Sequence, residues 1–179
     1  LISLANNHMG DFGQYGLVAT LNAFKSACVI GAGNWDEAYK VKKIQIHGLR
    51  IGFLSLAQCE FGILNDNWES NTLLGSGWIN HHSVNSIIQK EKQSLDYLFV
   101  LTHAGLEYTD IPLPEWRDRY KELIEIGADA VIGGHPHVPQ GWETHKGKPI
   151  FYSLGNFCFE GEDEHKYWHS GLCVIITVD

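Results

Sequence analysis

Polar residues that can bind a metal ion follow three apolar segments of the 179-residue chain, at 1–5, 95–101 and 130–132. These residues are Asn7, His8, His103, His135 and His137. Imidazole nitrogens and an amide oxygen suit borderline divalent metals such as Zn, Mn or Fe. In an open α/β sheet, ligand sites gather outside the carboxyl ends of the strands. The sequence therefore predicts that the three segments converge and present these side chains to one site.

The pair His135 and His137 is the sharpest local signal. Two residues apart on an extended chain, both rings can face the same way, and the preceding Gly133 and Gly134 allow a close approach. Such a pair also arises by chance on surfaces, but its place after an apolar strand favours metal ligands. His103 by itself is equally well explained as a hydrogen-bonded core histidine, and Asn7 as part of a left-handed turn.

Strand-like and helix-like stretches alternate along the chain, which indicates a layered α/β domain. Leu17, Leu21 and Phe24 recur at helical spacing, and Gly31 and Gly33 are expected beyond the end of that helix as its stop. Two further helices are expected, one from residue 84 and one over 114–127. Strands are expected at 1–5, 41–46, 49–53, 95–101, 130–132, 149–154 and 172–178.

Two stretches are expected to be loops. Residues 59–82 lack any hydrophobic period and are too long for an ordinary connection, so we expect a functional surface loop with Trp68 and Trp78 beside the site. The competing interpretation is that both rings pin the loop to the core. Residues 160–170 are charged and are expected to be a solvated surface.

Composition narrows the class of protein. Hydrophobic residues make up 44% of the chain, which favours a globular domain, and its length favours one domain over residues 1–179. The formal net charge of -8 disfavours a nucleic-acid or anionic-membrane surface. No apolar run approaches the roughly 20 residues that cross a bilayer. Because the chain starts at Leu1 on an apolar segment, we expect it to lack the natural N-terminus.

Four ordered motifs resemble those of the bacterial capsule synthesis protein CapA family. They are ANNHMGDFG at 5–13, HAGLEY at 103–108, GADAVIGGHPHV at 127–138 and KPIFYSLGNF at 148–157. That family takes part in poly-γ-glutamate biosynthesis and resembles the calcineurin-like metallophosphatases in fold. The resemblance implies an α/β layered sandwich, with β-sheets flanked by helices and incomplete at the N-terminus.

The resemblance also implies roles for single residues. Asn7, His103, His135 and His137 match metal ligands, and His8 matches a catalytic histidine. Asp11 would orient His8, or else cap a helix. Glu107 and Asn156 match family positions that we assign to substrate binding.

Two departures from the family pattern matter. Ala104 replaces the tryptophan of the HWGxEY motif, which would reshape one wall of the pocket. The opening segment, which in the superfamily carries aspartates for the first metal, has no counterpart. The resemblance implies two divalent ions (Mn, Zn or Fe) in the complete protein. We therefore expect this chain to keep most of one metal's shell and only His137 of the other's.

Two functions remain open at this stage. The first is a metal-dependent phosphoesterase-like hydrolase, and the second is a non-catalytic factor for binding, exporting or assembling an anionic polymer. The partners would be the polymer or a phosphoester, within a membrane biosynthetic complex at the cell envelope, and no nucleic acid. A polyanion would need a local basic patch, for which Arg117, Arg119, Lys146 and Lys148 are candidates.

Overall fold

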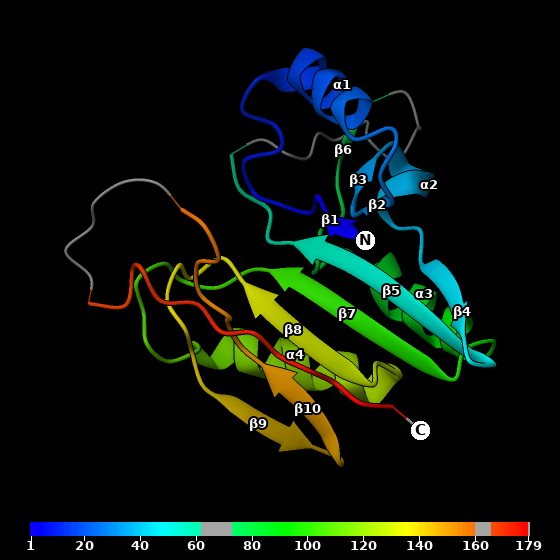
Figure 1. Ribbon diagram of the computed structural model, residues 1–179, viewed down its shortest axis with the longest axis vertical. Helices are drawn as coiled ribbons and strands as arrows, with labels where there is room; N and C mark the ends of the chain where they lie inside the picture. Colours follow the sequence, from blue (N-terminus) through cyan, green and yellow to red (C-terminus); the bar gives the residue numbers. More distant parts are fainter. Residues whose placement is uncertain (62–72, 160–165, 179) are drawn as a thin grey trace.

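A six-stranded sheet forms the centre of the computed structural model, which describes residues 1–61, 73–159 and 166–178 (Figure 1). The strand order is β4-β5-β7-β8-β10-β9. Their bounds are β4 Lys42–Ile46, β5 Leu49–Ala57, β7 Tyr97–His103, β8 Ala130–Gly134, β9 Trp142–His145 and β10 Lys148–Phe151. The four central strands run parallel, and β4 and β9 are antiparallel edges. The expected α/β fold is therefore confirmed.

Both edges of the sheet are hairpins closed by two residues with positive φ. The turn between β4 and β5 holds His47 and Gly48, and the turn between β9 and β10 holds Lys146 and Gly147. Two positive φ values match the right-handed twist of the strands. The two strands of the first hairpin were predicted, at 41–46 and 49–53. Strand β9 was not, because its sequence WETH is short and largely polar.

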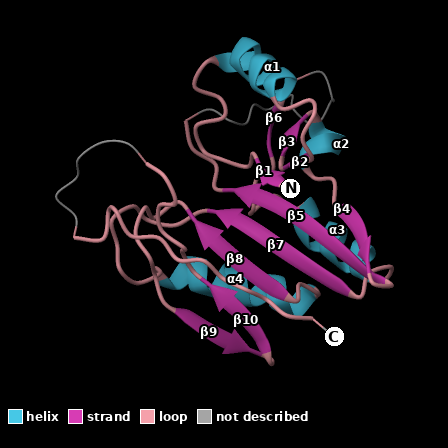
Figure 2. Ribbon diagram, viewed as in Figure 1, coloured by secondary structure: helices cyan, strands magenta, loops and turns pink. Residues whose placement is uncertain are grey.

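Two helices cover one face of the sheet (Figure 2). They are α3 (Ser83–Lys92) and α4 (Pro114–Ile126), and both were predicted. Pro114 suits the first turn because its nitrogen has no hydrogen to leave unpaired. Gly127 ends α4 at φ 136°, a conformation that favours glycine. Apolar side chains of the two helices and the sheet form the main core, which includes Ile88, Leu123 and Val131.

The C-terminal segment covers the opposite face and corrects one prediction. The expected strand at 172–178 is wrong, because the segment crosses the sheet in front of its strands (Figure 1). Ile176 and Val178 pack there against Ile51, Phe99 and Ala130. The apolar residues of this segment therefore cover a face of the sheet and do not add a strand to an edge. Both edges are already taken by β4 and β9.

A smaller group of elements lies at the carboxyl end of β5 (Figure 1). It consists of β1 (Ile2–Ser3) parallel to β2 (Val29–Ile30), β3 (Ala32–Gly33) antiparallel to β6 (Gly75–Ser76), α1 (Gly13–Ala23) and α2 (Trp35–Ala38). The predicted buried strand at 1–5 shrinks to two residues, with Ile2 exposed and Leu4 buried.

The predicted helix stop at Gly31 is also wrong, because α1 already ends at Ala23 and Gly33 belongs to β3. Gly31 instead has φ 87° and passes so close to Ala5 and Ser55 that a Cβ would lie 2.7 and 2.9 Å from their Cβ atoms. Glycine is needed there for a close backbone approach.

The two predicted loops are only partly described. Trp68 and residues 160–165 lie outside the described residues. Trp78 is half-buried, forms an isolated bridge with Ala57 and packs against the main core. No helix in the described ranges is both long and apolar enough to span a bilayer.

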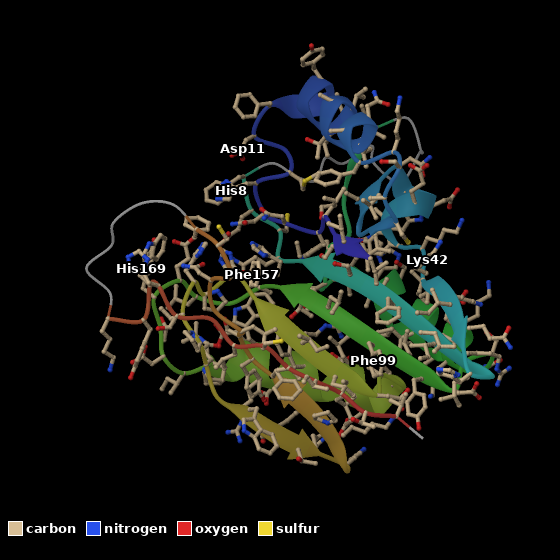
Figure 3. The ribbon with its side chains drawn as sticks, viewed as in Figure 1. His8, Asp11, Lys42, Phe99, Phe157 and His169 are labelled. Carbon is tan, nitrogen blue, oxygen red and sulfur yellow. The ribbon has the colours of Figure 1, made fainter. Side chains whose placement is uncertain are left out.

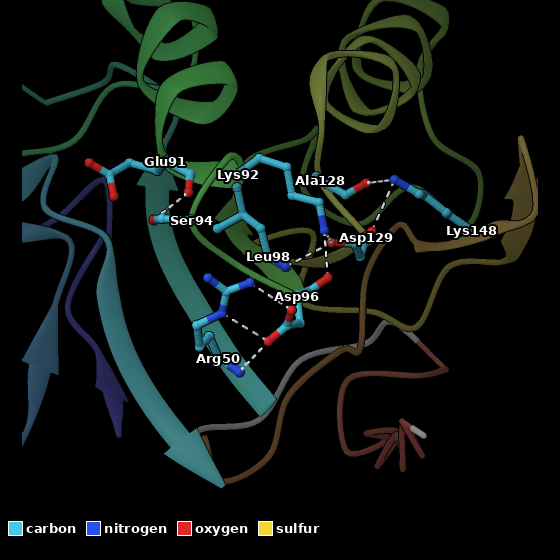
Figure 4. A network of polar contacts seen from close by, with 9 residues as sticks. All are labelled: Arg50, Glu91, Lys92, Ser94, Asp96, Leu98, Ala128, Asp129 and Lys148. Carbon is cyan, nitrogen blue, oxygen red and sulfur yellow. Dashed lines mark hydrogen bonds and ion pairs between the residues drawn. The ribbon is translucent and has the colours of Figure 1, made fainter. Parts of the chain in front are cut away.

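Ion pairs fix the end of the sheet where the parallel strands begin (Figure 4). Arg50 donates through Nε and Nη2 to the Asp96 carboxylate at 3.1 and 2.9 Å, and this holds the pKa of Asp96 at about 2. Asp129 accepts from Lys92 at 2.6 Å and from the Leu98 N–H at 2.8 Å, and its other oxygen lies 3.0 Å from Lys148 Nζ. Burial raises the pKa of Asp129, but these donors outweigh it and leave the value below its usual range.

We expect Asp129→Asn to lower the free energy of unfolding by about 1–3 kcal/mol at pH 7, because it removes charge-assisted hydrogen bonds. The folded pKa is depressed, so this stability is present above the ordinary aspartate pKa of about 4 and is lost as the pH falls through the folded value. Urea unfolding at pH 7 and pH 3 measures both effects. The exposed Asp118→Asn is the matched control and should change little; an equal loss in both variants would contradict the role of Asp129.

Candidate functional site

The carboxyl ends of three parallel strands bring polar side chains together. His103 is the last residue of β7, His135 follows β8, and Gln58 follows β5. The turn after β1 adds Asn7. Figure 3 shows His8, Asp11 and Phe157 around this side of the molecule. The structure thus places three of the four predicted metal ligands in mutual contact.

Three ligand-type atoms converge in this cluster. Asn7 Oδ1 lies 3.0 Å from His103 Nε2, which lies 3.2 Å from His135 Nδ1. Asn7 is fully buried and His135 nearly so. Neighbouring ligand atoms around one cation, each at about 2.1 Å from it, are separated by roughly 3.0–3.4 Å. The spacing is that of hydrogen bonds and is also compatible with a shared cation.

The hydrogen bonds assign the protons of this cluster. Gln58 Oε1 accepts from the Gly105 N–H at 2.8 Å, so the Gln58 amide donates to His135 Nε2 at 3.2 Å. Neutral His135 then carries its proton on Nδ1 and donates to His103 Nε2. Asn7 donates its amide to Glu60 at 2.9 Å, so its oxygen faces His103.

The consequence is that two acceptors face each other. His103 Nε2 and Asn7 Oδ1 are 3.0 Å apart with no proton left between them. Burial, followed by the nearby rings of His135 and His137, lowers the pKa of His103 to about 3, so the ring is neutral at pH 7. Burial also lowers the pKa of His135. A buried and a partly buried acceptor that face each other beside a neutral imidazole fit a divalent cation.

A second group of ligand atoms adjoins the first. Glu107, His135 and His137 each offer one atom, and these atoms lie within 4.8 Å of one another. Glu107 was assigned to substrate binding from the sequence, and the structure places it among side chains that could hold a metal ion. His137 donates through Nδ1 to Asn156 Oδ1 at 2.9 Å, while the Asn156 amide donates to the Trp168 carbonyl. That arrangement leaves the lone pair of His137 on Nε2.

The backbone at this histidine pair differs from the predicted extended chain. His135 and His137 have φ of 98° and 61°, values that non-glycine residues adopt at a cost of about 1–3 kcal/mol each. The expected extended geometry is therefore wrong, although both rings still reach one cluster. Surrounding contacts hold the strained turn, including the Tyr108 N–H that donates to the Pro136 carbonyl at 2.9 Å.

His8 and Asp11 form a separate pair at the rim. His8 Nδ1 lies 3.0 and 3.2 Å from the two Asp11 oxygens, and the ring stacks on Phe61. Asp11 does not cap α1, since that helix follows Phe12 and has no side-chain cap. Both side chains are about half exposed, so the pair faces solvent beside the buried cluster.

Gln58 and Glu60 are site residues that the sequence reasoning missed. The signal was present, because they follow the apolar strand β5 as His135 follows β8. A cleft of about 350 Å³ opens from them, bordered by Trp78 and Trp116. The expected position of Trp78 beside the site therefore agrees with the structure.

Comparisons with known proteins show which family the chain belongs to. The family model for the bacterial capsule synthesis protein PGA_cap matches residues 1–161. The capsule biosynthesis protein CapA of Bacillus anthracis is 32% identical over 89% of this chain and 40% of its own length. The PGA biosynthesis protein CapA of Bacillus subtilis (strain 168) is 31% identical over 89% of this chain and 42% of its own. The chain thus spans less than half of these relatives.

A solved structure supports the fold. A putative 5'-nucleotidase from Staphylococcus aureus, crystallised with α-ketoglutarate, superposes with a TM-score of 0.54 at 21% identity. The match covers 82% of this chain and 31% of the nucleotidase. This likeness concerns the metallophosphatase-like arrangement of sheet and helices alone. With the family match over residues 1–161, the motifs that converge at the strand ends identify the chain as a member of the bacterial capsule synthesis protein PGA_cap family.

Proposed function

We propose that this chain serves the biosynthesis of an anionic capsule polymer of the poly-γ-glutamate type as a metal-dependent, phosphoesterase-like hydrolase. The observation that carries the proposal is the facing pair of acceptors, the buried Asn7 Oδ1 and the partly buried His103 Nε2, which lie 3.0 Å apart. A purely structural histidine would present an N–H group, not a lone pair, to the Asn7 oxygen. The partners in this role are a phosphoester or the polymer itself, within a biosynthetic complex at the membrane.

The donor set suits divalent Mn, Zn or Fe. Asn7 and His103 would hold one ion, and His135 would join them once its proton leaves Nδ1. Glu107 and His137 would hold a second ion beside it. Bound ions in such sites neutralise charge on the attacked group and supply a hydroxide at neutral pH. Asn156 would fix the orientation of the His137 ring, as an outer hydrogen-bond partner does for a metal-ligating imidazole.

His8 is placed to move a proton. Its Nδ1 is engaged by the Asp11 carboxylate, which orients the ring and leaves Nε2 as the atom that gives or takes a proton. Its partial exposure lets a leaving group approach from solvent, next to the buried cluster. His8 therefore acts as the general acid in this proposal and Asp11 as its positioning residue.

The second candidate function, non-catalytic polymer binding, needs a cationic surface. A hollow lined by unpaired lysines provides one, away from the histidine cluster. Hydrolysis and binding predict different behaviour of His8, because only hydrolysis needs a proton donor at this position.

We expect His135→Asn to weaken Mn²⁺ or Zn²⁺ binding more than Asn156→Ala, because His135 belongs to both groups of ligand atoms. Loss of the outer partner Asn156 should lower metal affinity about 10–100-fold. Isothermal titration and elemental analysis measure the effect. His145→Asn is the matched control, since that ring pairs with Glu125 on the surface. Wild-type affinity in His135→Asn would contradict the metal site.

We expect His8→Asn to keep its metal content but to lose turnover by about 10²–10⁴, which is the usual contribution of a positioned general acid. Asp11→Asn should show a smaller loss, because it acts through the orientation of His8. Hydrolysis of bis(p-nitrophenyl) phosphate by the metal-loaded protein is the measurement, with His47→Asn in the β4–β5 turn as control. Absence of turnover in the wild type, with polymer production in cells still supported by His8→Asn, would favour the assembly function.

A further inference from the structure

A hollow of about 640 Å³ lies where α2, the start of β4 and α3 meet. Four lysines line it, namely Lys40, Lys42, Lys43 and Lys90, against the two carboxylates Asp36 and Glu91. Lys42 lies on the other side of the view from His8 and Phe157 (Figure 3). The hollow is therefore a different surface from the histidine cluster and shares no lining residue with it.

The lysines of the hollow differ from most cations of the chain. Elsewhere, Lys and Arg side chains are neutralised by carboxylates, including all four cations first considered for a basic patch: Arg117 with Glu143, Arg119 with Glu122, Lys146 with Glu125 and Lys148 with Asp129. Lys43 pairs with Glu91 at 2.7 Å. Among described residues, the cations with no carboxylate within ion-pair distance are Lys25, Lys40, Lys42 and Lys90.

The unpaired cations thus gather in one place. All of them except Lys25 line the hollow, in a chain whose net charge is -8. Like charges that share a concave surface repel one another, and an anion relieves that repulsion. The concentration of free positive charge distinguishes this surface from the other basic regions of the molecule.

Four of the residues that line the hollow are apolar or aromatic. Trp35 and Tyr39 lie with ring centroids 4.5 Å apart, and Val41 and Ile87 complete the lining. A second hollow of about 240 Å³ shares Lys40 and Lys42 and continues along Leu21, Val29 and Ile30. An occupant can therefore place anionic groups on the lysines and aliphatic segments on the walls, and can extend past Lys40 and Lys42 into the neighbouring hollow.

We propose that this hollow, centred on Lys40, Lys42 and Lys90, binds an extended polycarboxylate chain. Carboxylates at intervals would pair with the three free ammonium groups, and the methylene groups between them would contact Trp35 and Tyr39. The anion-binding surface follows from the arrangement of charges in the fold. The identification of its ligand as the capsule polymer rests on the function proposed above.

The test compares two triple variants that remove the same charge. Lys40→Gln/Lys42→Gln/Lys90→Gln empties the hollow of free cations. Lys25→Gln/Lys146→Gln/Lys166→Gln removes three exposed lysines elsewhere. Binding of fluorescently labelled poly-γ-glutamate is followed by anisotropy at low and physiological salt, without added metal. Thermal unfolding of both variants checks that they fold.

We expect the first variant to bind about tenfold more weakly than the wild type, since exposed charge pairs each contribute little, and the second to bind nearly as the wild type. Neutral polyglutamine should not bind. Equal losses in both variants, or no binding by the wild type, would overturn the proposal. Polyphosphate that binds as tightly, with the same dependence on the lysines, would overturn the preference for carboxylates.

The metal-site variant His135→Asn separates the two proposals. It should keep its affinity for poly-γ-glutamate, since His135 lies outside the hollow. A loss of polymer affinity in His135→Asn, with Lys40→Gln/Lys42→Gln/Lys90→Gln unaffected, would place the polymer at the histidine cluster and overturn the assignment to the lysines. Failure of phosphoester hydrolysis alone would leave binding at the hollow intact.

Discussion

The parallel pairing of β5, β7 and β8 is the constraint on which the site depends. Its register sets Ala57 opposite His103, and His103 opposite Gly134, so the three strands end at one level. Gly133 permits the close passage of the next chain segment, because a Cβ there would lie 2.1 Å from the Tyr152 carbonyl oxygen. The histidines are thereby brought together by backbone pairing, before any side chain contributes to their contact.

The sequence predicted those parts of the fold that local pattern determines. Apolar strands gave the position of His103 and His135, and Pro114 and Gly127 gave both ends of α4. Contacts between segments far apart in the sequence determine the parts of the fold that the local pattern does not predict. The apolar residues Ile176 and Val178 have the pattern of a strand, but they cover a face of the sheet.

The site shows the same division between what the sequence predicts and what it does not. The rule that polar residues after strands converge applies equally to Gln58 and Glu60, whose amide and carboxylate orient His135 and Asn7. Their identity alone suggests ordinary surface residues, so they were missed. The positive φ of His135 and His137 occurs in the turn that leaves β8, and it was not predicted because few residues other than glycine adopt it, even though histidine does so more often than most. The pairing of Asp11 with His8 likewise depended on where α1 begins.

Three regions of the molecule differ in how their charged and titratable side chains are paired. Where the parallel strands begin, Asp96 and Asp129 are saturated by cations and hold the sheet together. At the opposite ends of the strands, the partly buried His103 is neutral and presents a lone pair, which suits a cation. Unpaired ammonium groups lie in a third place, between α2, β4 and α3, where they suit an anion. The proposed metal site and the proposed polyanion site need this separation, because free lysines beside the histidine cluster would repel the metal ions that we propose to bind there.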